Sequence, residues 1–342
     1  MSSCHGEGGI SDNGDTPSQM QYQNKPLTTR IYTADPSAHY WENRIYIYAS
    51  HDIETDAVPD EIGSQFDMRD YYVISLDKIG GEVTISRKAL DIKDIPWASK
   101  QLWAPDAAYK DGTYFLYFPA KDHNGIFRIG VAKSTSPDGP FKAQSQPIDG
   151  AFSIDPAIFE DDDGSHYMYF GGIAGGQLQY WKNGKFDKRD AVVEKDEVAL
   201  TPFVAKLADN MTEFAAPARK IQIIDKLGNP LLAADINRRF FEAAWLHKKN
   251  DVYYLSYSTG DTHYLVYATS DNPYGPFTYQ GRVLEPVEGW TTHHSIIEIN
   301  SKTYLFYHDT QISGETHLRN VKVTEIIYDQ DGKLKTVHPM KN

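Results

Sequence analysis

Residues 153–170 read Ser-Ile-Asp-Pro-Ala-Ile-Phe-Glu-Asp-Asp-Asp-Gly-Ser-His-Tyr-Met-Tyr-Phe, and this stretch decides the fold. An acidic residue leads into a short apolar run, a polar turn follows, and a tyrosine-rich run completes the unit. Short apolar runs bounded by Asp, Gly and Pro are typical of two antiparallel strands joined by a hairpin. The same order of features returns four more times, at residues 35–48, 106–117, 242–257 and 293–307.

A second repeat lies farther out in two of these units. Ser-Thr-Ser-Pro-Asp-Gly-Pro-Phe at residues 134–141 and Thr-Ser-Asp-Asn-Pro-Tyr-Gly-Pro-Phe at residues 269–277 each follow an alternating apolar run. This pattern indicates a third strand that turns into an outer fourth strand. Four-stranded units repeated around an axis describe a β-propeller. The sequence therefore predicts an all-β fold, a five-bladed β-propeller in a single domain.

The N-terminal residues differ in composition from the rest of the chain. Residues 1–24 are small, polar and rich in Gly and Ser, with no basic and apolar signal segment. We expect a flexible polar tail over residues 1–24 and the catalytic propeller domain over residues 25–342. These features predict a cytoplasmic protein. The alternative is a periplasmic protein or lipoprotein whose signal before Cys4 was removed.

The overall charge excludes some partners. Among the 342 residues, 34 Lys and Arg stand against 47 Asp and Glu, which gives a formal net charge of −13. Such a chain repels phosphate backbones, so we expect no nucleic-acid partner. No apolar run is long enough to span a membrane. The oligomeric state stays open.

The repeats also indicate where the chemistry lies. In a propeller the first strand of each blade lines the axis, so the residues that open these strands meet at one mouth of the channel. These residues are Asp35, Asp106, Asp155, Glu242 and His293. Any one Asp beside a proline is more simply a turn cap, but several carboxyls at one mouth repel one another and point to function. A carboxyl group with a raised pKa and another that stays ionised suit glycosidic bond cleavage.

Four segments resemble the signature segments of glycoside hydrolase family 43, the five-bladed propellers that invert configuration. They are Thr33-Ala-Asp-Pro-Ser-Ala, Trp103-Ala-Pro-Asp, Ser153-Ile-Asp-Pro-Ala-Ile and Phe241-Glu-Ala-Ala-Trp, and the resemblance extends over residues 27–337. Residues 48–52, 66–70 and 289–295 are most similar to the exo-acting β-xylosidase and α-L-arabinofuranosidase branch of that family.

The resemblance implies a role for each carboxyl group. Asp35 corresponds to the general base that activates water, Glu242 to the general acid, and Asp155 to the third carboxylate that raises the pKa of the acid. We expect ionised Asp155, with Phe241 and Trp245 excluding water, to keep Glu242 protonated. Direct attack by water also predicts about 6.5–9.5 Å between the carboxyl groups of Asp35 and Glu242.

Other site residues follow from the same resemblance. Trp103, Ala104, Pro105 and Ile154 correspond to the lining of the sugar site, and Arg319 to an arginine that reaches the acids or a substrate hydroxyl. The alternatives are a core position for Trp103 and a solvated surface position for Arg319. We expect a structural role for Asp106, which would accept hydrogen bonds from backbone amides at a strand start.

A metal site is implied as well. His293 corresponds to a family histidine that faces a hydrated calcium ion in the channel, and Ca²⁺ would take most of its ligands from water. The alternative is a buried histidine without an ion. No organic cofactor is implied.

The sequence thus predicts an inverting exo-glycosidase that releases terminal pentose. The leading interpretation is release of xylose from β-1,4-xylooligosaccharides or xylan. The oligosaccharide is the expected partner. Release of arabinofuranose from arabinoxylan or arabinan side chains is the second reading. Two other interpretations are a carbohydrate-binding propeller without catalysis and a retaining five-bladed enzyme, which would release the opposite anomer.

Overall fold

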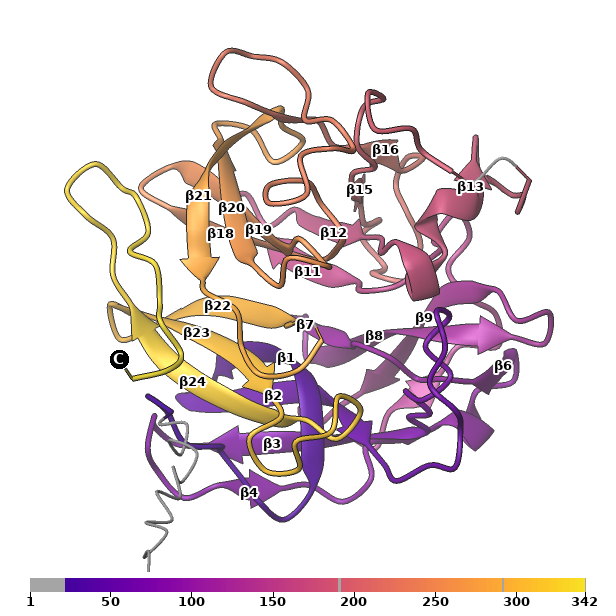
Figure 1. The fold of residues 1–342 in the computed structure, drawn as a ribbon. Helices are drawn as coiled ribbons and strands as arrows, with labels where there is room; N and C mark the ends of the chain where they lie inside the picture. The colour runs from indigo at the N-terminus through magenta and orange to yellow at the C-terminus, as the bar shows by residue number, and fades with distance from the viewer. Residues whose placement is uncertain (1–21, 190–191, 291, 342) are drawn as a thin grey trace, which may run out of the picture.

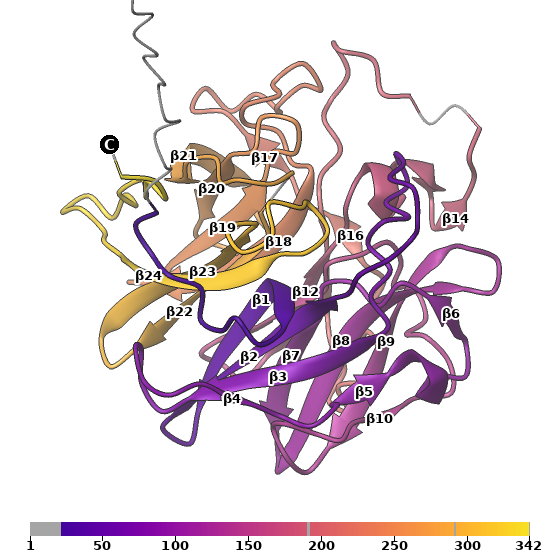
Figure 2. The ribbon, with the colours of Figure 1, turned by 60° about the horizontal axis from the view of Figure 1, so that its bottom comes forward.

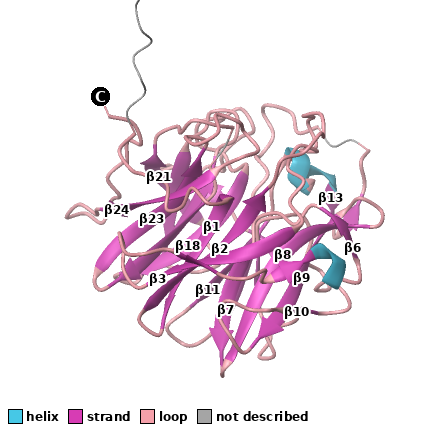
Figure 3. Cartoon of the chain, turned by 90° about the horizontal axis from the view of Figure 1, so that it is seen from below, coloured by secondary structure: helices cyan, strands magenta, loops and turns pink. Residues whose placement is uncertain are grey.

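The computed structural model describes residues 22–189, 192–290 and 292–341. In this part of the chain the regular structure is almost entirely β, and the helical elements are three short 3-10 turns (Figure 3). These turns are η1 (Ile92–Asp94), η2 (Ala174–Gly176) and η3 (Leu178–Tyr180). No helix among the described residues is long and apolar enough to cross a membrane.

Five antiparallel sheets stand around a central axis, with β1, β7, β11, β18 and β22 innermost (Figure 1). The first two blades contain β1 (Tyr32–Trp41), β2 (Arg44–Asp52), β3 (Asp70–Leu76), β4 (Thr84–Ile85) and β5 (Leu90–Asp91), then β6 (Ala98–Lys100), β7 (Asp106–Lys110), β8 (Thr113–Asp122), β9 (Phe127–Ser134) and β10 (Lys142–Ala143). The five-bladed propeller predicted from the repeats is confirmed.

The remaining blades follow in chain order. The third contains β11 (Ala157–Glu160), β12 (His166–Phe170), β15 (Phe203–Lys206) and β16 (Arg219–Lys220), with the hairpin β13 (Trp181–Lys182) and β14 (Lys185–Phe186) beside it. The fourth contains β18 (Glu242–Lys249), β19 (Val252–Ser258), β20 (Leu265–Ser270) and β21 (Phe277–Leu284), to which β17 (Ile223–Ile224) adds in parallel. The fifth contains β22 (His294–Ile299), β23 (Lys302–Asp309) and β24 (Asn320–Ile326).

The tyrosine that ends each repeat explains why the repeat exists. This residue lies on the second strand of every blade and is fully buried at Tyr48, Tyr117, Tyr169, Tyr257 and Tyr307. Tyr117 donates its hydroxyl hydrogen to the carbonyl of Met211 in the next blade at 2.8 Å, and Tyr169 does the same to Pro273 at 2.6 Å. Tyr48 donates to the carbonyl of Pro137. Pro137 and Pro273 belong to the second repeat, so the two sequence repeats meet and join neighbouring blades.

The two ends of the chain close the ring. The backbone N–H of Leu27 donates to the carbonyl of Val321 on β24 at 2.8 Å, so the segment before β1 runs beside the last strand (Figure 2). Tyr22 forms a bridge with Met340, and the Asn24 side chain donates to the Tyr307 hydroxyl at 3.1 Å. Residues 22–24 were predicted as tail but contact the propeller, whereas residues 1–21, including Cys4, lie outside the described residues.

Candidate active site

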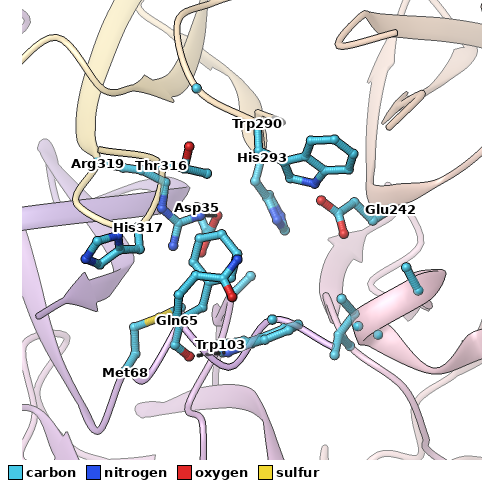
Figure 4. Close-up of a pocket in the computed structure, with 18 of the residues that line it drawn as sticks. Asp35, Gln65, Met68, Trp103, Glu242, Trp290, His293, Thr316, His317 and Arg319 are labelled. Atoms are coloured by element: carbon cyan, nitrogen blue, oxygen red, sulfur yellow. Dashed lines mark hydrogen bonds and ion pairs between the residues drawn. The ribbon is translucent and has the colours of Figure 1, made fainter. Parts of the chain in front are cut away.

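Four of the five residues that open the inner strands line one cavity of about 890 Å³ at a mouth of the channel (Figure 4). The structure brings together most of the residues singled out in the sequence: Asp35, Trp103, Ala104, Ile154, Asp155, Glu242, His293 and Arg319 line this pocket. Pro105 does not line it. It is buried where the chain enters β7, so this residue does not form part of the pocket wall.

The backbone is irregular where the carboxyl groups enter the pocket. Strand β1 has a bulge between Ala34 and Ser37, and Asp35 within it has φ 52°. Strand β18 has a bulge directly after Glu242, where Ala243 has φ 62°. Asp155 has φ 57°. Positive φ costs about 1 kcal/mol or more for a residue with a side chain, and bulges redirect side chains. The sheets thus deviate from regular geometry where they present the acids.

Asp35 is buried and held ionised. Arg319 Nη1 donates to its Oδ1 at 3.0 Å and the Ser50 hydroxyl donates to its Oδ2 at 2.6 Å. Burial raises the pKa of Asp35. The charge of Arg319, with smaller contributions from His308, His293 and the Ser50 hydrogen bond, outweighs this effect and lowers the pKa to about 2. Since an ionised carboxylate can accept a proton from water, this is the protonation state that a general base needs.

Glu242 is shifted in the opposite direction. Burial raises its pKa to about 8, the negative charge of Asp35 adds to that rise, and Arg319 partly opposes it. Figure 4 shows Asp35 and Glu242 on opposite sides of the pocket. The pocket therefore holds one ionised carboxylate and one protonated carboxylic acid at neutral pH, the pair that acid–base cleavage of an acetal requires.

Asp155 lines the pocket together with Glu242. Its Oδ2 accepts the backbone N–H of Ala243 at 2.9 Å, which fixes it beside Glu242. Burial, and then the charges of Glu242 and Asp35, raise the pKa of Asp155 well above its usual value. The charge of Asp35 raises the pKa values of both Glu242 and Asp155, which lie side by side and titrate as a pair. Trp245 does not shield Glu242, because its indole is buried in the core and donates to the Ile296 carbonyl at 3.0 Å.

Arg319 lies inside the site and not on the surface. Its Nε and Nη2 donate to the two carboxylate oxygens of Asp52 at 2.8 and 2.7 Å, and its backbone N–H donates to Asp52 Oδ2 at 2.8 Å. Asp52 is itself buried. Bidentate pairing fixes the plane of the guanidinium, so the remaining Nη1 points at Asp35. Sequence reasoning missed Asp52 as an individual residue, although it ends a segment that resembles the family.

Aromatic and glycine residues shape the sugar site. Trp103 donates its indole N–H to the Phe66 carbonyl at 2.8 Å, and the Phe127 ring packs 4.6 Å from it. Ile154 forms another part of the wall. A Cβ at Gly172 or Gly176 would lie 2.6 or 2.7 Å from its side chain, so only glycine fits there.

Asp106 has the structural role that was expected. Its Oδ1 accepts the backbone N–H of Ala107 at 2.6 Å, and its Oδ2 accepts that of Ile158 in the next blade. Oδ1 also pairs with His39 Nε2 at 2.6 Å. These bonds satisfy the buried carboxyl and join two inner strands, so it is absent from the pocket lining.

His293 is the residue expected to face a calcium ion. Its Nδ1 lies 3.8 Å from Asp155 Oδ2, and burial lowers the pKa of the imidazole, which is therefore neutral. Among the described residues, no group of three or more His, Cys, Asp or Glu side chains is arranged to hold a metal ion. Since Ca²⁺ takes 6–8 oxygen ligands, direct coordination by the protein does not fit. A hydrated ion beside His293 stays a proposal.

Several pocket residues were not found from the sequence as individual positions. They come from the loops that follow β2, β21 and β23, and include Gln65, Met68, Trp290, Glu315, Thr316 and His317. These loops have no strand periodicity, and the family resemblance of residues 66–70 and 289–295 reaches only Met68 and Trp290 among them.

Comparisons with known proteins agree with this geometry. The model of the glycosyl hydrolases family 43 matches residues 24–334. A xylosidase/arabinosidase 43A of Humicola insolens is 58% identical over 324 residues, which cover 92% of this chain and 99% of that protein. A β-xylosidase of Xylanibacter ruminicola is 50% identical over 309 residues, 90% of this chain and 97% of that protein.

A solved structure is similarly close. It is a family 43 β-xylosidase/α-arabinofuranosidase from a compost microbial metagenome, in complex with xylotriose and in a calcium-free form, with 59% identity and a TM-score of 0.91. The alignment covers 93% of this chain and 98% of that one. The fold and the family match define a glycoside hydrolase. The chain belongs to glycosyl hydrolase family 43, as its four signature segments predicted.

Proposed function

We propose that this glycoside hydrolase is an inverting exo-acting enzyme that releases terminal xylose from β-1,4-xylooligosaccharides. The observation that supports it most is the pair of opposite pKa shifts across one pocket, at about 2 for Asp35 and about 8 for Glu242. The names of the relatives, xylosidase/arabinosidase and β-xylosidase, support the substrate class.

The reaction needs one proton donor and one proton acceptor. Asp35 removes a proton from a water molecule, whose oxygen attacks C1 of the terminal sugar. Glu242 gives its proton to the glycosidic oxygen, which leaves with the next sugar. Asp155 orients the acid because it holds the backbone beside it, and Arg319 keeps Asp35 ionised. The spacing expected for such direct displacement is about 6.5–9.5 Å between the two working carboxyls.

Exo action fits the side of the pocket around Asp35. Gln65, Met68 and His317 gather there, away from Glu242 (Figure 4). With loops closing this side, one sugar would lie over the carboxyl pair while the rest of the chain leaves past the acid.

Arabinofuranose release is the second candidate, because the Humicola insolens relative is named for both sugars. Incubation with xylobiose and with the arabinofuranosyl nitrophenyl glycoside would rank the two. NMR of the first product should show α-xylose from a β-linked substrate, and a β-anomer would refute direct attack by water.

A carbohydrate-binding propeller without catalysis is tested by the same assay. The Asp35→Asn and Glu242→Gln variants should lose turnover of xylobiose by at least about 100-fold, as expected when a general base or acid is removed. Unchanged rates in both would refute the assigned roles.

Calcium is a further part of the proposal. If a hydrated calcium ion lies at His293, the affinity of the protein for calcium, measured by calorimetry, should differ between the wild type and His293→Ala.

A further inference from the structure

One wall of the pocket carries an aromatic side chain that the reaction described above does not use. Trp290, in the segment between β21 and β22, lines the pocket while 40% of its surface is exposed. Its ring meets His263 edge-on, with centroids 5.2 Å apart, and Phe241 at 6.4 Å. Leaving a large aromatic ring in water is unfavourable, and exposed apolar surface beside a cavity marks a binding surface.

The backbone holds this tryptophan from behind. Gly289 has φ 111°, and a Cβ there would lie 2.9 Å from the Thr310 methyl carbon. The backbone N–H of Thr310 donates to the carbonyl of Glu288 at 3.2 Å, and Tyr22 donates its hydroxyl hydrogen to the Glu288 carboxylate. Tyr22 near the N-terminus and the loop after β23 thus hold the residues before Trp290 in place.

The position of Trp290 relative to Glu242 decides which sugar it can meet. Phe241 precedes the acid in the chain and touches the tryptophan, and Figure 4 shows Trp290 beside Glu242 and across the pocket from Asp35. A general acid protonates the oxygen that departs with the leaving sugar. The leaving sugar must therefore lie on the side of Glu242, next to Trp290.

We propose that Trp290, backed by Phe241 and His263, is the platform on which the pyranose ring of the leaving sugar packs. The C–H face of a pyranose is apolar and fits an indole face, whereas its hydroxyl groups point outward to water. The assignment rests on the proposed function, because Glu242 must be the acid. It adds a second binding position to the pocket and makes Trp290 a residue that selects the leaving group.

The test compares two leaving groups on the same terminal xylose. Xylobiose has a pyranose to place on the platform, and methyl β-xyloside has only a methoxy group. We expect Trp290→Ala to lower kcat/KM for xylobiose about 10-fold, the scale of one lost aromatic contact, and to change methyl β-xyloside less than about 2-fold. Trp290→Phe should give an intermediate loss. Ile236→Ala is the matched control, since Ile236 is 46% exposed but does not line the pocket.

The ratio of the two substrates separates the possible outcomes. An equal loss on both would mean that Trp290 shapes the acid or the terminal sugar site, and no loss on either would mean that it binds nothing. Either result overturns the platform. If the wild-type protein cleaves neither substrate, the proposed xylosidase function fails. The same ratio is then measured with an arabinobiose and a methyl arabinofuranoside. A Trp290→Ala effect confined to the disaccharide would support the platform, and the absence of such an effect would overturn it.

Discussion

Replacing Glu242 with Gln should stabilise the protein at alkaline pH while it removes the acid. The side chain of Glu242 is partly buried in the pocket wall, and its pKa is raised from an ordinary 4.5 to about 8 by burial and by the charge of Asp35. Above pH 4.5 the unfolded chain has released this proton, but the folded protein keeps it until about pH 8. Stability from this group is therefore fully present below pH 4.5 and is lost as the pH rises through 8.

The size of the effect follows from the two pKa values. The interval from 4.5 to about 8, at about 1.4 kcal/mol for each pH unit, corresponds to about 5 kcal/mol of unfolding free energy. A chain of 342 residues has an unfolding entropy of about 0.7 kcal/mol/K, so the melting temperature should differ by about 7 °C. Glutamine is uncharged and nearly isosteric, so the variant should lack this pH dependence.

The assay is the melting temperature of the wild type and of Glu242→Gln between pH 4.5 and pH 9. The two curves should lie close together at the acid end and separate with rising pH, with the variant melting at the higher temperature. Because the charge of Glu242 also raises the pKa of Asp155, the difference reports the titration of this pair and not that of Glu242 alone. The exposed Glu54→Gln variant is the control and should follow the wild type. Parallel curves for wild type and Glu242→Gln would refute the conclusion that the folded state holds a proton on this carboxyl.

Two further predictions concern the base and the sugar site. Without the guanidinium, only the smaller contributions of His308, His293 and Ser50 oppose the burial of Asp35, and its pKa rises from about 2. Arg319→Gln should therefore lose kcat/KM on the acid side at a higher pH than the wild type, and a pH–rate profile with an unmoved acid limb contradicts this. A Cβ at Gly63 would lie 2.8 Å from the Trp103 ring, so Gly63→Ala should raise KM for xylobiose. Gly80 has a similar φ and no atom within 4 Å of the position that a Cβ would take, so Gly80→Ala is the control and should leave KM unchanged. Equal KM values for the two variants would show that Trp103 is not part of the sugar site.

Much of the site was accessible from the sequence because the fold repeats. Once five equivalent inner strands are recognised, Asp35, Asp155 and Glu242 must open at the same mouth, although more than 200 residues separate the first from the last. The buried tyrosines show the same logic, since each sits at one position of the repeat, and Tyr48, Tyr117 and Tyr169 each join one blade to the next.

The parts that could not be predicted lie between the repeats or depend on summed charges. Asp52 and Arg319 meet across 267 residues, and no pattern in either segment indicates the pairing. Trp290 lies in a loop whose path is set by Gly289 and Thr310. The protonation of the Glu242 and Asp155 pair could not be predicted, because a sequence gives neither the depth of burial nor the number of anions that face one group.

The charges of the pocket form a consistent set that links activity to stability. Arg319 lies between Asp35 and Asp52, so these three groups keep one net negative charge, and protons on Glu242 and Asp155 prevent further repulsion. The same negative charge on Asp35 that makes it a base also keeps Glu242 protonated as an acid. The unfolding free energy should therefore fall between pH 4.5 and about pH 8, and activity should fall above about pH 8, because both depend on the one proton that Glu242 gives to the substrate.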